Sequence, residues 1–270
     1  MKHTFTRRDF LGASAALSAA AMFNRTSFAQ GFNVMTGAQS YSFRQFPFPE
    51  CIKRLKELGL TNMEFCSAHF PPNADDPGFA NVKSDIEQEG INVLCFGVEE
   101  FTGDADANRA KFRFAKALGV KILTANPTPE SFASLEILSP DFDVKIAIHN
   151  HGPGARYDKA ADTLRAVQDR IPYIGACVDT GHVIRSGEKP HEVIEQLGSR
   201  VLSLHLKDWI HGGEEQILGK GDIDLVAVAK ALKNVGFAGP VMFEYENHPE
   251  NPVPDMLEGL KNWQEALKSA

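Results

Sequence analysis

The chain has 270 residues, with 28 basic and 35 acidic side chains and a formal net charge of −7. Phosphate backbones require basic surfaces, so this acidic balance excludes nucleic acid as the expected partner. The length is too great for one small β-sandwich and is typical of a single α/β barrel.

The N-terminal segment predicts an export signal. Arg7 and Arg8 precede an apolar stretch and then Ser27-Phe28-Ala29, the small-x-small pattern that a signal peptidase cuts. Paired arginines before Phe-Leu resemble a twin-arginine signal, which implies a periplasmic or otherwise exported protein. The apolar stretch is shorter than the ~20 residues of a membrane-spanning helix, so we expect cleavage and no stable membrane anchor. The predicted organisation is a signal peptide at 1–29 and one domain at 30–270.

From Phe32 onward, short apolar segments alternate with segments of helical periodicity. Eight such units without a linker predict a single (β/α)8 TIM barrel. A doubly wound open sheet would carry a glycine-rich phosphate turn after its first strand, and Gly37-Ala38-Gln39-Ser40 lacks it. The expected strands are Val34–Ser42, Thr61–Ser67, Ile91–Val98, Val120–Asn126, Lys145–His151, Ile174–Val183, Val201–Trp209 and Gly239–Glu246.

The four cysteines contain no C-x-x-C pair, which excludes a zinc ribbon or a thioredoxin motif. Three of them, Cys66, Cys95 and Cys177, fall inside expected strands. We therefore expect buried thiols that act as small apolar side chains. A disulfide remains an open alternative in an oxidising compartment.

The last four expected strands end in polar residues, and the carboxyl ends of barrel strands form the active face. These ends are His149-Asn150-His151, Asp179-Thr180-Gly181-His182, His205-Leu206-Lys207-Asp208 and Glu244-Tyr245-Glu246. Alternate residues of a strand share a face, so each strand directs a His, Asp or Glu toward the barrel axis. Burying these groups together is costly unless a cation compensates their charge. We predict one divalent metal bound by His149, Asp179, His205 and Glu244.

The type of ligand does not choose among Mn²⁺, Zn²⁺, Co²⁺, Fe²⁺ and Mg²⁺. Gln39, Glu64 and Glu246 also fall at strand ends and are candidates to bind hydroxyl groups of a substrate, or else solvated positions at the rim. Trp209 is expected in the core or at the pocket, and Asp222 is expected to cap a helix.

Four motifs resemble the xylose-isomerase-like barrel superfamily, which contains sugar isomerases, ketose 3-epimerases and inosose dehydratases. They are Val178-Asp179-Thr180-Gly181-His182, His205-Leu206-Lys207-Asp208, the segment Leu218–Asp224 and Phe243-Glu244. The resemblance implies one divalent metal held by Glu, Asp, His and Glu, the last three of which fall on Asp179, His205 and Glu244. It also implies that His182 binds a substrate oxygen. The first glutamate of the family falls on His149, which is a departure.

The resemblance implies a metal-dependent isomerase or epimerase that acts through an enediolate on a non-phosphorylated ketose or polyol. Glu244 is the expected base, Lys207 would stabilise an oxyanion, and His151 and His182 would carry protons. Because His149 replaces a glutamate, epimerisation by two carboxylates is in doubt, and a lyase that eliminates a β-oxygen from a keto-sugar or 3-keto-glycoside is the alternative. A non-catalytic sugar- or metal-binding barrel is a second alternative. The sugar, the metal and the oligomeric state, with a homo-oligomer among the choices, stay open.

Overall fold

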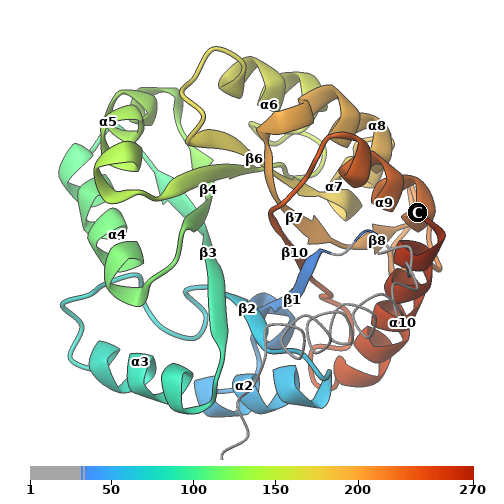
Figure 1. Cartoon of the computed structure of the whole chain (residues 1–270), viewed down its shortest axis with the longest axis horizontal. Helices are drawn as coiled ribbons and strands as arrows, with labels where there is room; N and C mark the ends of the chain where they lie inside the picture. The colour runs from blue at the N-terminus through green and yellow to red at the C-terminus, as the bar shows by residue number, and fades with distance from the viewer. Residues whose placement is uncertain (1–31, 33) are drawn as a thin grey trace, which may run out of the picture. The chain divides into compact units, whose positions relative to one another are not determined.

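The protein folds as a closed barrel of parallel strands. A computed structural model describes residue 32 and residues 34–270, so the expected export signal at 1–29 lies outside the described residues. Eight strands close in the order β1-β10-β7-β6-β5-β4-β3-β2. Figure 1 shows these strands as an inner ring with the helices around them. The predicted (β/α)8 barrel is confirmed, and each of the eight expected segments overlaps one strand of the barrel, although most of the strands are shorter than expected.

The strands of the barrel and the pair outside it have the following bounds: β1 (Met35–Gln39), β2 (Asn62–Phe65), β3 (Asn92–Phe101), β4 (Ile122–Pro127), β5 (Lys145–His149), β6 (Ile174–Asp179), β7 (Val201–Leu206), β10 (Pro240–Phe243), and the antiparallel pair β8 (Asp208–Trp209) and β9 (Glu215–Gln216). The helices are η1 (Ser40–Phe43), α2 (Phe48–Glu57), α3 (Phe79–Gln88), α4 (Ala105–Leu118), η2 (Pro129–Ser131), α5 (Phe132–Phe142), α6 (Ala160–Val167), α7 (Thr180–Arg185), α8 (Pro190–Leu197), η3 (Gly198–Arg200), α9 (Leu225–Asn234) and α10 (Val253–Ser269).

Local sequence explains where these elements begin and end. The side chain of Asp104 accepts hydrogen bonds from two backbone N–H groups of the first turn of α4, which satisfies donors that the helix leaves free. The same helix ends at Gly119, whose φ of 92° is left-handed and suits glycine. Such starts and stops allow each helix to turn back and pack against the strand before it.

The interior of the barrel contains a small apolar cluster made of Cys95, Ile122, Ala147, Cys177 and Met242. Three of these residues, Ala147, Cys177 and Met242, stand two positions before a polar residue at the end of their strand or directly after it, namely His149, Asp179 and Glu244. Residues two apart on a strand share a face, so the polar side chains form the next layer along the barrel axis. All four cysteines are buried and free, which confirms the expectation of structural thiols.

Two local expectations were wrong. The strand expected to reach Val183 ends at Asp179, because the Asp179 carboxylate accepts a hydrogen bond from the backbone N–H of His182 and starts α7. Asp222 does not cap a helix; Asp224 caps α9, while Asp222 accepts a hydrogen bond from the backbone N–H of His211. Within the part of the chain that the structure describes, no helix combines the length and apolar character needed to cross a bilayer.

Trp263 anchors α10 to the barrel, and its replacement tests how much this packing contributes to stability. Its side chain is fully buried, and its Nε1 donates a hydrogen bond to Oγ1 of Thr36 in β1 at 3.3 Å. We expect Trp263→Ala to lower the free energy of unfolding by about 3–5 kcal/mol, since a cavity replaces the indole. Urea denaturation measures this value. Leu257→Ala on the same helix is the control because Leu257 is 45% exposed, and equal effects of the two substitutions would contradict the assignment.

Candidate metal centre

Four neighbouring strand ends direct one side chain each to a common point. His149 and Asp179 are the last residues of β5 and β6, His205 lies near the end of β7, and Glu244 follows β10 directly. In the sheet register Asp179 stands beside His205, and Met242 stands beside His205 on its other side. The closed barrel therefore brings together residues that are far apart in the sequence.

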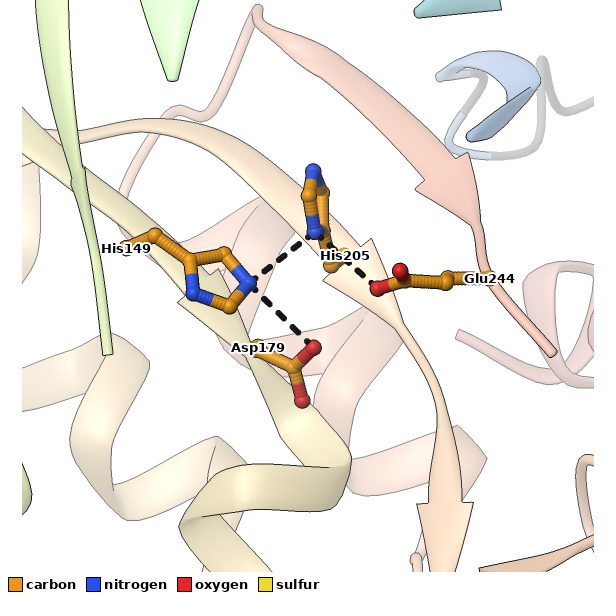
Figure 2. Close-up of side chains that lie close together, drawn as sticks. All are labelled: His149, Asp179, His205 and Glu244. Atoms are coloured by element: carbon orange, nitrogen blue, oxygen red, sulfur yellow. Dashed lines mark hydrogen bonds and ion pairs between the residues drawn. The ribbon is translucent and has the colours of Figure 1, made fainter. Parts of the chain in front are cut away.

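One donor atom from each of these four side chains lies within 4.8 Å of all the others. Figure 2 shows His149 and Glu244 on either side of His205, with Asp179 next to His149. The Nε2 atom of His149 is 3.1 Å from Nδ1 of His205 and 3.4 Å from Oδ2 of Asp179. Nδ1 of His205 is 3.2 Å from Oε2 of Glu244. All four side chains are buried, so these groups meet with little water to separate them.

The hydrogen bonds of the ligands leave acceptor atoms facing one another. Oε2 of Glu64 is 2.9 Å from Nε2 of His205. Because a carboxylate only accepts, Nε2 of His205 carries the proton, and in the neutral ring Nδ1 turns its lone pair toward His149 and Glu244. Oδ2 of Asp179 has no hydrogen-bond partner, whereas its Oδ1 accepts from the backbone of His182. A cation shared by the four side chains would satisfy this arrangement.

The donor set of two imidazoles and two carboxylates fits Mn²⁺, Fe²⁺, Co²⁺ or Zn²⁺. Burial acts to lower the pKa of His205, but neighbouring acidic groups, among them Glu64, outweigh it and raise that pKa well above its usual value. Burial likewise acts to raise the pKa of Glu244, yet the charges of Lys207 and His205 hold it well below its usual value. Glu244 is thus ionised, as a metal ligand must be, whereas His205 has to release its Nδ1 proton before that nitrogen can bind the ion.

Glu64 differs from its expected position. The sequence suggested a contact with sugar hydroxyls, but the side chain is fully buried on β2, contacts His205 and does not line the pocket. A carboxylate that accepts a hydrogen bond from the far nitrogen of a metal-binding histidine fixes the ring and raises its basicity as a ligand. Glu64 therefore supports the metal centre from behind.

Lys207 is the buried cation of the site. Its Nζ is 3.2 Å from Oε2 of Glu244 and 3.7 Å from Oδ2 of Asp179, and it also pairs with Glu246. Burial acts to lower the pKa of Lys207, but Glu244, Asp179 and Glu246 raise it well above its usual value. Lys207 consequently stays charged and can donate hydrogen bonds to an oxyanion.

A pocket of about 580 Å³ opens above the centre. Its lining includes Gln39, His149, His151, His182, Lys207, Trp209, Glu244 and Glu246, so all of the expected substrate-facing residues except Glu64 border it. Burial lowers the pKa of His151 to about 4 and that of His182 to about 3. Both rings are therefore neutral near pH 7 and can accept a proton or donate a ring N–H.

Sequence reasoning missed three side chains around this pocket. Asp208 accepts hydrogen bonds from the backbone N–H groups of four residues, Trp209, Gly219, Gly221 and Ile223, and so holds the segment that follows β9. Glu215 accepts from the backbone N–H groups of Glu246 and Asn247, and burial raises its pKa to about 7. Arg185 lines the pocket beside Trp209. Gly219 and Gly221 after β9 were the sequence signal for this role of Asp208. A side chain at Gly221 would collide with the carboxylate of Asp208.

Comparison with known proteins identifies the family of this barrel. The model of the family described as Xylose isomerase-like TIM barrel matches residues 52–268. An inosose dehydratase from Clostridium beijerinckii is 27% identical over 248 residues, which covers 79% of this chain and 80% of that protein. A 3-oxo-isoapionate decarboxylase from Pectobacterium atrosepticum is 31% identical over 141 residues, or 44% of this chain and 50% of that protein. In this match and in those with two other inosose dehydratases, the aligned part spans about half the length of the relative.

Solved structures show the same fold. An uncharacterised protein from Parabacteroides distasonis superposes with a TM-score of 0.68 at 27% identity, over 86% of this chain and 98% of that one. The D-psicose 3-epimerase of Clostridium cellulolyticum superposes with a TM-score of 0.69 over 87% of this chain and 100% of that one, at 14% identity. At 14% identity, the match with the D-psicose 3-epimerase shows a common fold and nothing more.

Removal of a ligand tests the metal centre directly. We expect Asp179→Ala or His205→Ala to lose the bound divalent ion, because each variant removes one of four donors from a buried set. Elemental analysis of the purified protein gives the metal content, and circular dichroism shows whether the barrel persists. A folded variant that keeps a full equivalent of metal would refute the ligand set.

Glu64→Gln tests the support behind His205. We expect metal affinity to fall by about 10–100-fold, since the neutral amide no longer polarises the ring. Competition with a chelating dye measures this affinity. Glu87→Gln, an exposed change of equal charge on α3, should leave it unchanged. If both variants bind as the wild type does, Glu64 has no part in metal binding.

Proposed function

The chain belongs to the xylose isomerase-like TIM barrel family, and we propose on this basis that it is a divalent-metal-dependent lyase. It would remove a proton beside the carbonyl of a keto-sugar or keto-polyol and expel an oxygen from the next carbon. One observation carries this choice: the acids that line the pocket, Glu244 and Glu246, both follow β10, whereas the segments that follow β5 and β6 contribute the imidazoles of His151 and His182. Epimerisation by two carboxylates would need an acid on each face of the substrate.

The four ligands His149, Asp179, His205 and Glu244 would hold the ion, which supplies Lewis-acid polarisation of the substrate carbonyl. Lys207 keeps its charge in the pocket and would donate a hydrogen bond to the oxygen on which negative charge develops. The ionised Glu244 orients this cation, since its Oε2 is 3.2 Å from Nζ of Lys207. The hydrogen bond to the oxyanion and the ion pair with Glu244 both need a charged lysine, in agreement with the raised pKa of Lys207.

His151 is the candidate proton carrier. With a pKa lowered to about 4 by burial and by neighbouring His149, it is neutral near pH 7 and free to accept the proton. The C–H electron pair then forms a carbon–carbon double bond as the C–O bond breaks. The protonated His151, stabilised by the charges of Asp179 and Glu244, returns its proton to the departing oxygen. The products are an unsaturated ketone and water or an alcohol.

His182 would donate rather than accept. Nη1 of Arg185 lies 2.8 Å from its Nδ1. Since a guanidinium only donates, Nδ1 of His182 is the acceptor and Nε2 carries the proton. The Nε2–H group is therefore available to a substrate oxygen, in keeping with the substrate-binding role that the family resemblance implies.

The relatives support the same class of reaction. An inosose dehydratase aligns over four fifths of both chains, and elimination of water from a keto-polyol is the reaction that its name describes. We also propose that the export signal predicted at residues 1–29 directs the protein out of the cytoplasm, where a non-phosphorylated substrate is expected.

Isomerisation is the second candidate, and the lone carrier His151 also favours it. A single base that takes a proton from one carbon can return it to the neighbouring carbon on the same face. Such a shuttle interconverts an aldose and a ketose without a second acid. It therefore competes with elimination wherever the substrate lacks a leaving oxygen.

Proton NMR in heavy water separates these reactions. We expect metal-loaded protein to release the β-substituent from an inosose or a 3-keto-glycoside and to generate near-ultraviolet absorbance from the unsaturated product. His151→Gln should lower the rate by about 100-fold or more while metal content stays intact. His191→Gln on α8, outside the pocket, is the matched control. Clean interconversion of two ketose epimers, with deuterium at one carbon and no released group, would exclude the lyase.

A further inference from the structure

Arg185 lines the same pocket and is held in one orientation. It is the last residue of α7, and its Cζ lies 4.8 Å from the ring centroid of Trp209. On another side, a methyl group at Gly152 would lie 2.9 Å from that Cζ. The guanidinium thus packs against the indole ring and the backbone of Gly152, and it also donates to His182. Three contacts from three segments fix the plane of this side chain.

In the part of the chain that the structure describes, the charge of Arg185 has no acidic partner. Among the described residues, no carboxylate oxygen lies within 4.0 Å of its nitrogen atoms, whereas Lys207, the other cation of the pocket lining, contacts three carboxylates. A guanidinium has five N–H donors, and one of them is used by His182. An arginine that is already oriented and lacks an anion is suited to bind one from outside the protein.

We propose that Arg185 binds a carboxylate of the substrate, so that the preferred ligands are sugar acids rather than neutral sugars. This inference rests on the proposed function because it assigns the substrate class of the same pocket. The planar fork of arginine matches a carboxylate in a bidentate arrangement. A phosphate dianion fits less well, because Glu244 and Glu246 border the pocket and Lys207 is already paired with both.

The proposal gives Arg185 two connected tasks. The guanidinium that would receive the carboxylate also fixes the tautomer of His182, which donates toward the reacting part of the substrate. Binding of an acid would therefore hold the substrate at one end while His182 contacts the other polar groups. Removal of Arg185 would abolish carboxylate binding and also release the tautomer of His182. A loss of affinity for acids alone must therefore be distinguished from a loss of affinity for all ligands.

Calorimetric titration with D-glucuronate and D-glucuronamide provides that separation, because the two ligands differ in charge and hardly in shape. We expect metal-loaded wild-type protein to bind glucuronate at least about tenfold more tightly than glucuronamide. Arg185→Gln should reduce the ratio to about twofold or less. Gly152→Ala should also reduce it, since the added methyl group displaces the guanidinium and keeps its charge. Arg109→Gln, an exposed change of equal charge on α4, should keep the wild-type ratio.

Several outcomes would overturn the inference. They are equal affinities of the wild type for the two ligands, a ratio that survives in Arg185→Gln, and tighter binding of D-glucose 6-phosphate than of glucuronate. If Arg185→Gln does not fold by circular dichroism, the wild-type ratio and Gly152→Ala decide. The test measures binding and not turnover. The ratio of affinities can therefore be interpreted even if the protein does not catalyse the proposed elimination. Conversely, equal affinities for the two ligands would not contradict the lyase assignment.

Discussion

The structure depends on two carboxylates and two imidazoles that direct their acceptor atoms to one buried point. Uncompensated, such a cluster would oppose folding, since desolvated like charges repel each other. Lys207, which pairs with Glu244 and Asp179, compensates part of this negative charge, and the four side chains form a donor set that suits a divalent ion. In the pocket above this layer, burial is the main reason that His151 and His182 are neutral, and the charge of Lys207 adds to it.

The four proposed ligands were accessible from the sequence because two simple periodicities place them. Strand alternation puts His149, Asp179 and His205 on the inner face, and barrel topology puts the carboxyl ends of strands at one opening. The small residues two positions earlier, such as Ala147 and Cys177, carry the same pattern in the interior cluster. Strand alternation and barrel topology together therefore predict one location for the four ligands.

Other parts of the site could not be predicted in this way. Glu64 and His205 are 141 positions apart, and their contact exists only because the barrel closes. The start of α7 at Thr180 was not predicted, because the apolar residues around it also suit a strand. The orientation of Arg185, the last residue of α7, could therefore not be predicted either. Tertiary contact decides both cases, whereas periodicity reports only which face a residue occupies.

Asp208 and Glu215 have a consequence for how this barrel can change. Their carboxylates hold the segments 219–223 and 246–247 through backbone N–H groups, and Gly221 leaves the room that the carboxylate of Asp208 needs. The tip at 210–214 between them is mostly exposed. Evolution or design can thus exchange this tip while the ion-binding layer stays as it is. Such an exchange would act on the pocket through Trp209, which lines it and donates a hydrogen bond to the backbone carbonyl of Gly213.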